Sequence, residues 1–194
     1  MLRRTMLARR RTFPAEERAH AGAAIRTRAA SLSLLRDADN IMLYASTAEE
    51  IDLFPLMETL LAQGRRIALP AITGKGMMEA RALSAMDALT EGAFGILTPD
   101  AARGSIVSPD MLDLVIVPGA AFAPDGRRLG LGGGYYDRFL PRAGNAVRLV
   151  LAFDWQLVPD VPAGGRDARV DVILTERRFV DCRSGIMENL EEEV

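Results

Sequence analysis

The chain has 194 residues, of which 49% are hydrophobic and 26% are charged, and its formal net charge is −2. This is the composition of an ordinary globular protein with one sizeable core, and the nearly balanced charge argues for neither a nucleic-acid nor an anionic-membrane partner. The single cysteine excludes an intramolecular disulfide, and with only one histidine a zinc site or a Cys/His catalytic pair is hard to build. No apolar run approaches the roughly 20 residues of a membrane helix. We therefore expect a cytoplasmic protein that works with carboxylates, arginines, backbone amides and a hard cation.

The N-terminal region is expected to form two helices. Residues 1–13 contain five arginines and no acid, and their spacing favours a basic helix on which arginines 9–11 form a solvated face. A mitochondrial transit peptide is also rich in arginine, but it would be richer in serine. Pro14 suits the first turn of a second helix, which we expect to run to about Leu35.

A strand, a helix and a second strand follow in that order. Residues 40–44 and 66–70 are short apolar runs typical of buried strands, and residues 53–63 between them carry apolar side chains on one helical face. The loop over residues 45–52, which contains Glu50, joins the first strand to the helix. The pattern predicts a βαβ unit with two parallel strands.

The remaining elements are expected to extend this unit into one sheet. Further strands are predicted at 77–83, 112–117, 148–152 and 170–174, a loop at 95–99, and a frayed acidic tail at 188–194. No linker or internal repeat divides the chain. We therefore predict a single α/β domain over residues 1–194, a three-layer α/β/α arrangement with a mostly parallel sheet and N-terminal helices.

The most polar stretch of the chain follows the strand at 112–117. It contains, in order, a turn at 124–126, Arg127 and Arg128, four glycines among residues 130–134, and then Tyr135, Tyr136 and Asp137 at the start of a short helix. A strand, a glycine loop and a helix start favour a phosphate cradle, because free backbone N–H groups point at the anion there. Arginines would neutralise the phosphate, and Asp137 would hold Mg²⁺ against its oxygens. The loop matches neither the GxxxxGK[ST] nor the GxGxxG pattern.

These residues carry a resemblance to a known family. RLGLGGGYYDRFL at 128–140, preceded by IVPGAAF at 116–122, resembles the signature of the 5-formyltetrahydrofolate cyclo-ligase family (5,10-methenyltetrahydrofolate synthetase). The resemblance spans nearly the whole chain. Its weaker flanking segments are PAEER at 14–18, EID at 50–52, QLV at 156–158, the aspartates Asp167 and Asp171, and TE at 175–176.

The resemblance implies an ATP- and Mg²⁺-dependent ring closure. Members of the family phosphorylate the formyl oxygen of 5-formyltetrahydrofolate, and a neighbouring nitrogen then attacks the activated carbon. Phosphate departs and leaves 5,10-methenyltetrahydrofolate. Transfer of a γ-phosphoryl group needs positioning and charge neutralisation more than a side-chain nucleophile, so the scarcity of His and Cys is no obstacle.

The resemblance also implies roles for individual residues. Those expected to hold the phosphates of ATP or to line its site are Arg3, Arg128, Gly130, Gly132, Gly133, Gly134, Tyr135 and Tyr136. The expected Mg²⁺ ligands are Asp137 and Asp167. Glu50 resembles the acid that hydrogen-bonds the amino-pyrimidine edge of the pterin, with Tyr136 at the boundary between nucleotide and folate. The expected catalytic residues are Arg128, Tyr136 and Asp137.

These side chains also have purely structural interpretations. Asp137 could be only a favourable charge in a first helical turn, Asp167 a turn residue, and Glu50 a solvated charge. Tyr135 and Tyr136 could be core or interface residues, and the role of Arg3, near a terminus, is the weakest of these assignments. The chain departs from the family pattern at Leu131, where a basic or aromatic residue is frequent, and at Arg166, where a histidine is expected. A lysine found four residues before the Arg3 position in the family has no counterpart.

Two other functions stay open on the sequence alone. A non-catalytic nucleotide- or folate-binding paralogue would keep the phosphate cradle without turnover. A sugar-phosphate isomerase or CoA-transferase-like enzyme would need a catalytic base or a glutamate nucleophile on a different loop. The expected partners are 5-formyltetrahydrofolate and ATP, without nucleic acid or membrane, for a chain that is a monomer or a weak homodimer.

Overall fold

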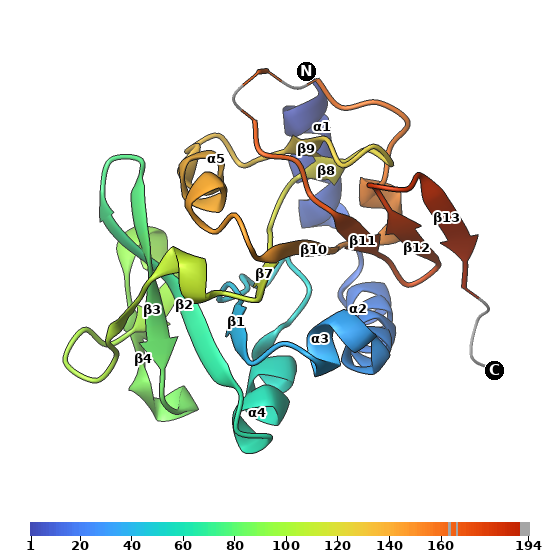
Figure 1. The fold of residues 1–194 in the computed structure, drawn as a ribbon. Coiled ribbons are helices and arrows are strands. Elements are labelled where there is room, and N and C mark those ends of the chain that lie inside the picture. Colours follow the sequence, from blue (N-terminus) through green and yellow to red (C-terminus); the bar gives the residue numbers. More distant parts are fainter. Residues whose placement is uncertain (163, 166, 191–194) are drawn as a thin grey trace.

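One nine-stranded mixed sheet organises the molecule in the computed structural model, which describes residues 1–162, 164, 165 and 167–190 (Figure 1). Its strand order is β13-β12-β11-β10-β7-β1-β2-β3-β6. The five central strands run parallel, namely β1 (Asn40–Met42), β2 (Arg66–Gly74), β7 (Leu114–Ile116), β10 (Val147–Leu151) and β11 (Val172–Leu174). The edge strands are antiparallel, namely β3 (Met77–Leu83), β6 (Ile106–Val107), β12 (Arg178–Asp181) and β13 (Ile186–Asn189).

Helices cover both faces of this sheet because the central strands are apolar on both sides. The helices are α1 (Leu2–Thr12), α2 (Ala15–Ser31), α3 (Ser33–Arg36), α4 (Phe54–Ala62) and α5 (Tyr135–Phe139). Leu114 and Ile116 of β7 pack with the layer of α2, α3 and α4, whereas Val115 of β7 and Val117, just after the strand, pack with the side that carries α5 (Figure 1). The predicted α/β class, the large sheet with a parallel centre and the N-terminal helices are confirmed.

Two small hairpins stand outside the main sheet. β8 (Ala121–Phe122) pairs with β9 (Arg128–Leu129), and β4 (Leu89–Glu91) pairs with β5 (Leu97–Pro99). The β8–β9 turn needs glycine at Gly126, where φ is +83° and a Cβ would lie 2.3 Å from the Val170 carbonyl oxygen. Helix α1 packs on this hairpin through Met6, which is buried in a small cluster with Ala121 and Leu129.

Three sequence expectations are corrected by the structure, and one strand was missed. The expected loop at 95–99 contains β5, and the single helix expected to reach Leu35 is two helices, because Leu32 has an extended backbone (φ −66°, ψ 132°). The tail expected to fray from residue 188 pairs as β13 as far as Asn189, and the strand before it, β12, was not predicted. All four residues of β13 are exposed, and two apolar residues are followed by two polar ones. The strand therefore lacks the alternation of apolar and polar side chains that predicts a half-buried strand. Residues 191–194 lie outside the described part of the chain.

The strand order places a switch point between β1 and β7. From β1 the chain passes through α4 to β2 on one side, whereas β7 and β10 lie on the other side of β1. In open α/β sheets, ligands bind beyond the carboxyl ends of the strands at such a point. The segments that leave the carboxyl ends of β1 and β7 contain Glu50 and Pro118, so this edge is where a site is expected.

Candidate active site

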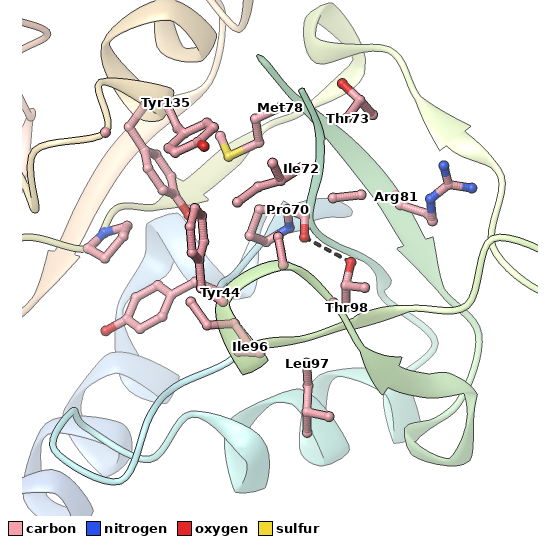
Figure 2. A pocket seen from close by; sticks show the side chains of 18 of the residues that line it. Tyr44, Pro70, Ile72, Thr73, Met78, Arg81, Ile96, Leu97, Thr98 and Tyr135 are labelled. Atoms are coloured by element: carbon pink, nitrogen blue, oxygen red, sulfur yellow. Dashed lines mark hydrogen bonds between the residues drawn. The ribbon is translucent and has the colours of Figure 1, made fainter. Parts of the chain in front are cut away.

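A cavity of about 650 Å³ lies at this edge of the sheet. Figure 2 shows one side of it, where Ile72 and Met78 come from β2 and β3 and Tyr135 comes from α5. The hydroxyl of Thr98 donates a hydrogen bond to the carbonyl of Pro70 (3.0 Å), which ties β5 to β2 beside the cavity. Residues of the predicted site that line the cavity are Glu50, Arg128, Gly130, Gly133, Gly134, Tyr135, Tyr136 and Asp137.

An ion pair between Arg128 and Asp137 forms part of the cavity wall. Arg128 lies on β9 with only 5% of its surface exposed, and its Nη2 donates to Asp137 Oδ1 at 2.6 Å. Its Nη1 donates to the carbonyl of Pro118 at 3.1 Å. The Asp137 oxygen also accepts the backbone N–H of Ala168 at 3.2 Å. The pair therefore joins the end of β7, hairpin β8–β9, the start of α5 and the segment before β11.

The glycine loop is held from outside by two arginines. Arg138 Nη1 donates to the carbonyls of Gly133 (3.1 Å) and Gly134 (3.0 Å), and Arg3 Nε donates to the carbonyl of Gly130 (2.8 Å). Gly134 precedes α5 with φ +64°, a left-handed conformation that glycine adopts without strain. These contacts engage the carbonyls of Gly130, Gly133 and Gly134, and all three glycines line the cavity.

Glu50 is fixed at a second side of the cavity. Its side chain is 10% exposed. Oε2 accepts the backbone N–H (2.9 Å) and the hydroxyl (3.0 Å) of Thr47, and Oε1 accepts Nη1 of Arg10 (3.0 Å). Arg10 was expected on a solvated face, and this expectation is wrong, because its side chain is only 12% exposed and pairs with an acid 40 residues further along the chain. Glu50 is likewise no freely solvated charge.

Two tyrosines also line the cavity: Tyr44 is buried, and Tyr136 is half-buried with a buried hydroxyl. Burial, with the nearby Glu50 carboxylate adding to it, raises the pKa of Tyr44, and burial is also the main cause that raises the pKa of Tyr136. Both phenols are therefore neutral at physiological pH. Tyr136 Oη and Arg128 Nε are buried without a hydrogen-bond partner among the described residues, so each could donate to a bound molecule. Tyr44 was not predicted as a site residue, although its place just past the carboxyl end of β1 was a usable signal.

Three predicted residues do not line the cavity, namely Arg3, Gly132 and Asp167. Arg3 donates its hydrogen bond to the carbonyl of Gly130, and Gly132 lies in the same loop beside Arg3. Asp167 Oδ2 accepts the backbone N–H of Gly164 at 2.6 Å, and the residue after it, Ala168, donates to Asp137. Arg166 lies outside the described residues.

Metal ligands are sparse in the part of the chain that the structure describes. No group of three or more His, Cys, Asp or Glu side chains is suitably placed there to hold a metal ion. Asp137 and Asp167 could together supply two carboxylates. Mg²⁺ usually takes only one or two carboxylates, with phosphate oxygens and water completing its six ligands. The Asp137 and Asp167 assignment therefore stays a prediction.

The helices of the described residues include none long and apolar enough to cross a membrane. Trp155 stacks on Phe153 with ring centroids 6.0 Å apart and meets Phe13 edge-on. Its indole thus packs among side chains of the protein.

Comparisons with known proteins agree on one family. Residues 1–176 match the sequence profile of the 5-formyltetrahydrofolate cyclo-ligase family. The 5-formyltetrahydrofolate cyclo-ligase of Mus musculus is 26% identical over 186 residues, which cover 90% of this chain and 92% of that protein. The protein of the same name from Escherichia coli K12 is 28% identical, over 86% of this chain and 94% of that protein. The NMR structure of 5,10-methenyltetrahydrofolate synthetase from Aquifex aeolicus has a TM-score of 0.85 and 31% identity, over 99% of this chain and 95% of that chain.

Proposed function

Because the chain belongs to the 5-formyltetrahydrofolate cyclo-ligase family, we propose that it closes 5-formyltetrahydrofolate to 5,10-methenyltetrahydrofolate, with ATP as co-substrate and Mg²⁺ as the metal. One observation carries the proposal. A single cavity of about 650 Å³ is lined both by Glu50 and by Arg128, Asp137 and the glycine loop, so an acid suited to a pterin and groups suited to phosphates face the same space.

The folate would occupy the side of the cavity nearer Glu50. The amino-pyrimidine edge of a pterin presents two N–H donors, and a carboxylate accepts such a pair well. Ile72, Met78 and Tyr135 offer apolar surface to flat rings. The buried hydroxyl of Tyr136, which has no partner among the described residues, could donate to the folate at its boundary with the nucleotide.

The triphosphate would lie along the glycine loop. Arg128 supplies positive charge and a free Nε, Arg3 reaches the loop from α1, and backbone amides of the loop can donate to phosphate oxygens. Asp137 Oδ1 is held by Arg128 and Ala168, and its Oδ2 accepts no hydrogen bond from the described residues, so the donor set fits Mg²⁺. When bound, Mg²⁺ would neutralise charge on the phosphates, with Asp137 and Asp167 as its protein ligands.

The proposed chemistry has two steps. The formyl oxygen attacks the γ-phosphorus, which forms a C–O–P bond and releases ADP. A neighbouring nitrogen then bonds to the formyl carbon and loses its proton, and the C–O bond breaks as phosphate leaves with the oxygen. Arg128 and the loop amides would stabilise the charge on the transferring group, and Glu50 would keep the pterin in place.

A direct assay tests this proposal. Protein incubated with 5-formyltetrahydrofolate, ATP and Mg²⁺ should produce the near-ultraviolet absorbance of the methenyl product, with one ADP formed per product. Omission of ATP or Mg²⁺ should abolish the signal. ATP binding without any product would favour the non-catalytic paralogue, and turnover without ATP would refute the proposed mechanism.

We also propose the setting in which the protein acts. The enzyme would work in the cytoplasm as a monomer or weak homodimer, because one chain supplies every residue assigned above. No nucleic acid or membrane takes part in the reaction. Sedimentation velocity over a range of protein concentrations would test the oligomeric state.

A further inference from the structure

Helix α1 presents one face to both sides of the cavity. Arg3, Met6 and Arg10 are spaced at i, i+3 and i+7, so they lie on the same side of the helix. Arg3 Nε donates to the carbonyl of Gly130 in the glycine loop, Met6 packs on hairpin β8–β9, and Arg10 reaches Glu50. The same helix therefore supports the phosphate side through Arg3 and the Glu50 side through Arg10.

Arg10 differs sharply from the arginine next to it. Its side chain is 12% exposed, whereas that of Arg11 is 71% exposed. Nη1 of Arg10 donates to Glu50 at 3.0 Å, and its Nε lies 3.6 Å from Glu49. Arg11 approaches only Glu49, at 4.0 Å. Burying the long side chain of Arg10 on an otherwise exposed basic helix requires a specific partner, and Glu50 is that partner.

We propose that Arg10 is the positioning residue of Glu50. Arg10 holds one carboxylate oxygen and Thr47 holds the other, so the carboxylate cannot rotate without breaking a hydrogen bond. The guanidinium also compensates the negative charge of Glu50 at this largely buried position. Glu50 would therefore meet the two donors of the pterin in a fixed orientation, without first being reordered.

Arg10 acts through Glu50 rather than on the ligand itself. It is absent from the lining of the large cavity, which Glu50 does line. A separate cavity beside Arg10, Tyr44, Glu50 and Gln156 measures only about 10 Å³, which is room for about one water molecule. No part of a folate fits there. This role rests on the proposed function, because it assumes that Glu50 binds the pterin.

Binding measurements on Arg10→Met test the proposal. Affinity for 5-formyltetrahydrofolate should fall roughly 10- to 100-fold, since a largely buried charge pair is broken, while affinity for Mg²⁺ and a non-hydrolysable ATP analogue changes less than about twofold. Arg10→Lys, which keeps the charge, should recover part of the folate affinity. Arg11→Met is the matched control on the same helix and should leave both affinities unchanged.

A double-mutant cycle with Glu50→Gln separates positioning from general stability. If Arg10 acts through Glu50, Arg10→Met should add less than about twofold to the folate defect of Glu50→Gln. Additive defects, or equal losses of folate and ATP-analogue affinity in Arg10→Met, would refute the role of Arg10. A wild-type protein that binds no folate would instead refute the proposed function and, with it, this role.

Discussion

Asp137 is the residue on which the phosphate side of the site depends most. Its Oδ1 accepts hydrogen bonds from Arg128 and from the backbone N–H of Ala168. The Oδ1 of an asparagine at this position could accept the same two hydrogen bonds. Asp137→Asn removes the negative charge that a Mg²⁺ ligand needs. We therefore expect kcat to fall at least roughly 100-fold, and the free energy of unfolding to fall by about 1–2 kcal/mol because the buried Arg128 loses its charged partner. Steady-state assays and a thermal melt check this, and a fully active variant would show that Asp137 is no metal ligand.

Arg128 and Arg127 are neighbours with different environments. Arg128 is buried against the cavity, whereas Arg127 pairs with Asp125 and Asp160, each at 2.7 Å, outside the cavity. Arg128→Ala should raise KM for ATP roughly 10-fold or more, because a charge-assisted contact to phosphate is lost, and should change KM for the folate far less. Arg127→Ala is the matched control with both constants near wild type. A defect confined to the folate would contradict the assignment of Arg128.

At the scale of elements, one carboxylate joins the loop after β10 to the β11–β12 hairpin. Asp154 Oδ1 accepts Arg178 Nε (2.7 Å) and the hydroxyl of Thr175 (2.9 Å), and Oδ2 accepts Arg178 Nη2 (2.8 Å). Burial alone would raise the pKa of Asp154, but the hydrogen bonds from Arg178 and Thr175 outweigh it and hold the pKa below its ordinary value of 3.8. The ionised form of Asp154 therefore stabilises the folded state.

Asp154→Asn should lower the free energy of unfolding by about 1–2 kcal/mol at pH 7. Because the folded-state pKa is depressed, this stabilisation is complete well above the unfolded pKa of about 4 and is lost as pH falls through the lower folded pKa. The gap between wild type and variant should therefore shrink as pH falls below about 4. Urea unfolding at pH 7 and below pH 4 measures it, and a gap that is constant or widens in acid would contradict this account.

Elements with strong local patterns were predictable from the sequence. The strands β1, β7, β10 and β11 each contain a run of buried apolar residues, and α4 has a clear apolar face. Strands without such a run were not predictable, although they pair with their neighbours in the chain. β13 is exposed at every residue, and in β4 and β5 only Pro99 is buried.

The same distinction applies to the candidate site. The glycine loop, Arg128 and Asp137 fall within one short stretch, so a single sequence motif identifies all of them. The burial of Arg10 depends on Glu50, 40 residues away, and a run of three arginines is predicted to be solvated until α1 is packed on hairpin β8–β9. The position of Tyr44 at a strand end is a signal for a site residue, but this signal can be used only when the strand order places β1 at the switch point.

At the scale of the whole molecule, the cavity is assembled from distant parts of the chain. Arg3 contacts Gly130 across 127 residues, and the lining also draws on β2, β3 and the β4–β5 hairpin. These groups converge only in the folded state, so a ligand of the cavity should bind the folded chain and not the unfolded one. Binding and global stability are then linked.

Thermal melts with ligands test this linkage. At about 100 times its dissociation constant, ATP with Mg²⁺ should add about 2.7 kcal/mol of stability and raise the melting temperature by roughly 5–10 °C for a chain of this size. A single domain over residues 1–194 should melt in one transition both with and without ligand. Asp137→Asn should lose the Mg²⁺-dependent part of the shift and keep the shift caused by folate, because Glu50 lies on another side of the cavity. A variant that keeps the full Mg²⁺-dependent shift would place the metal elsewhere, and loss of both shifts would mean that Asp137 supports the cavity as a whole.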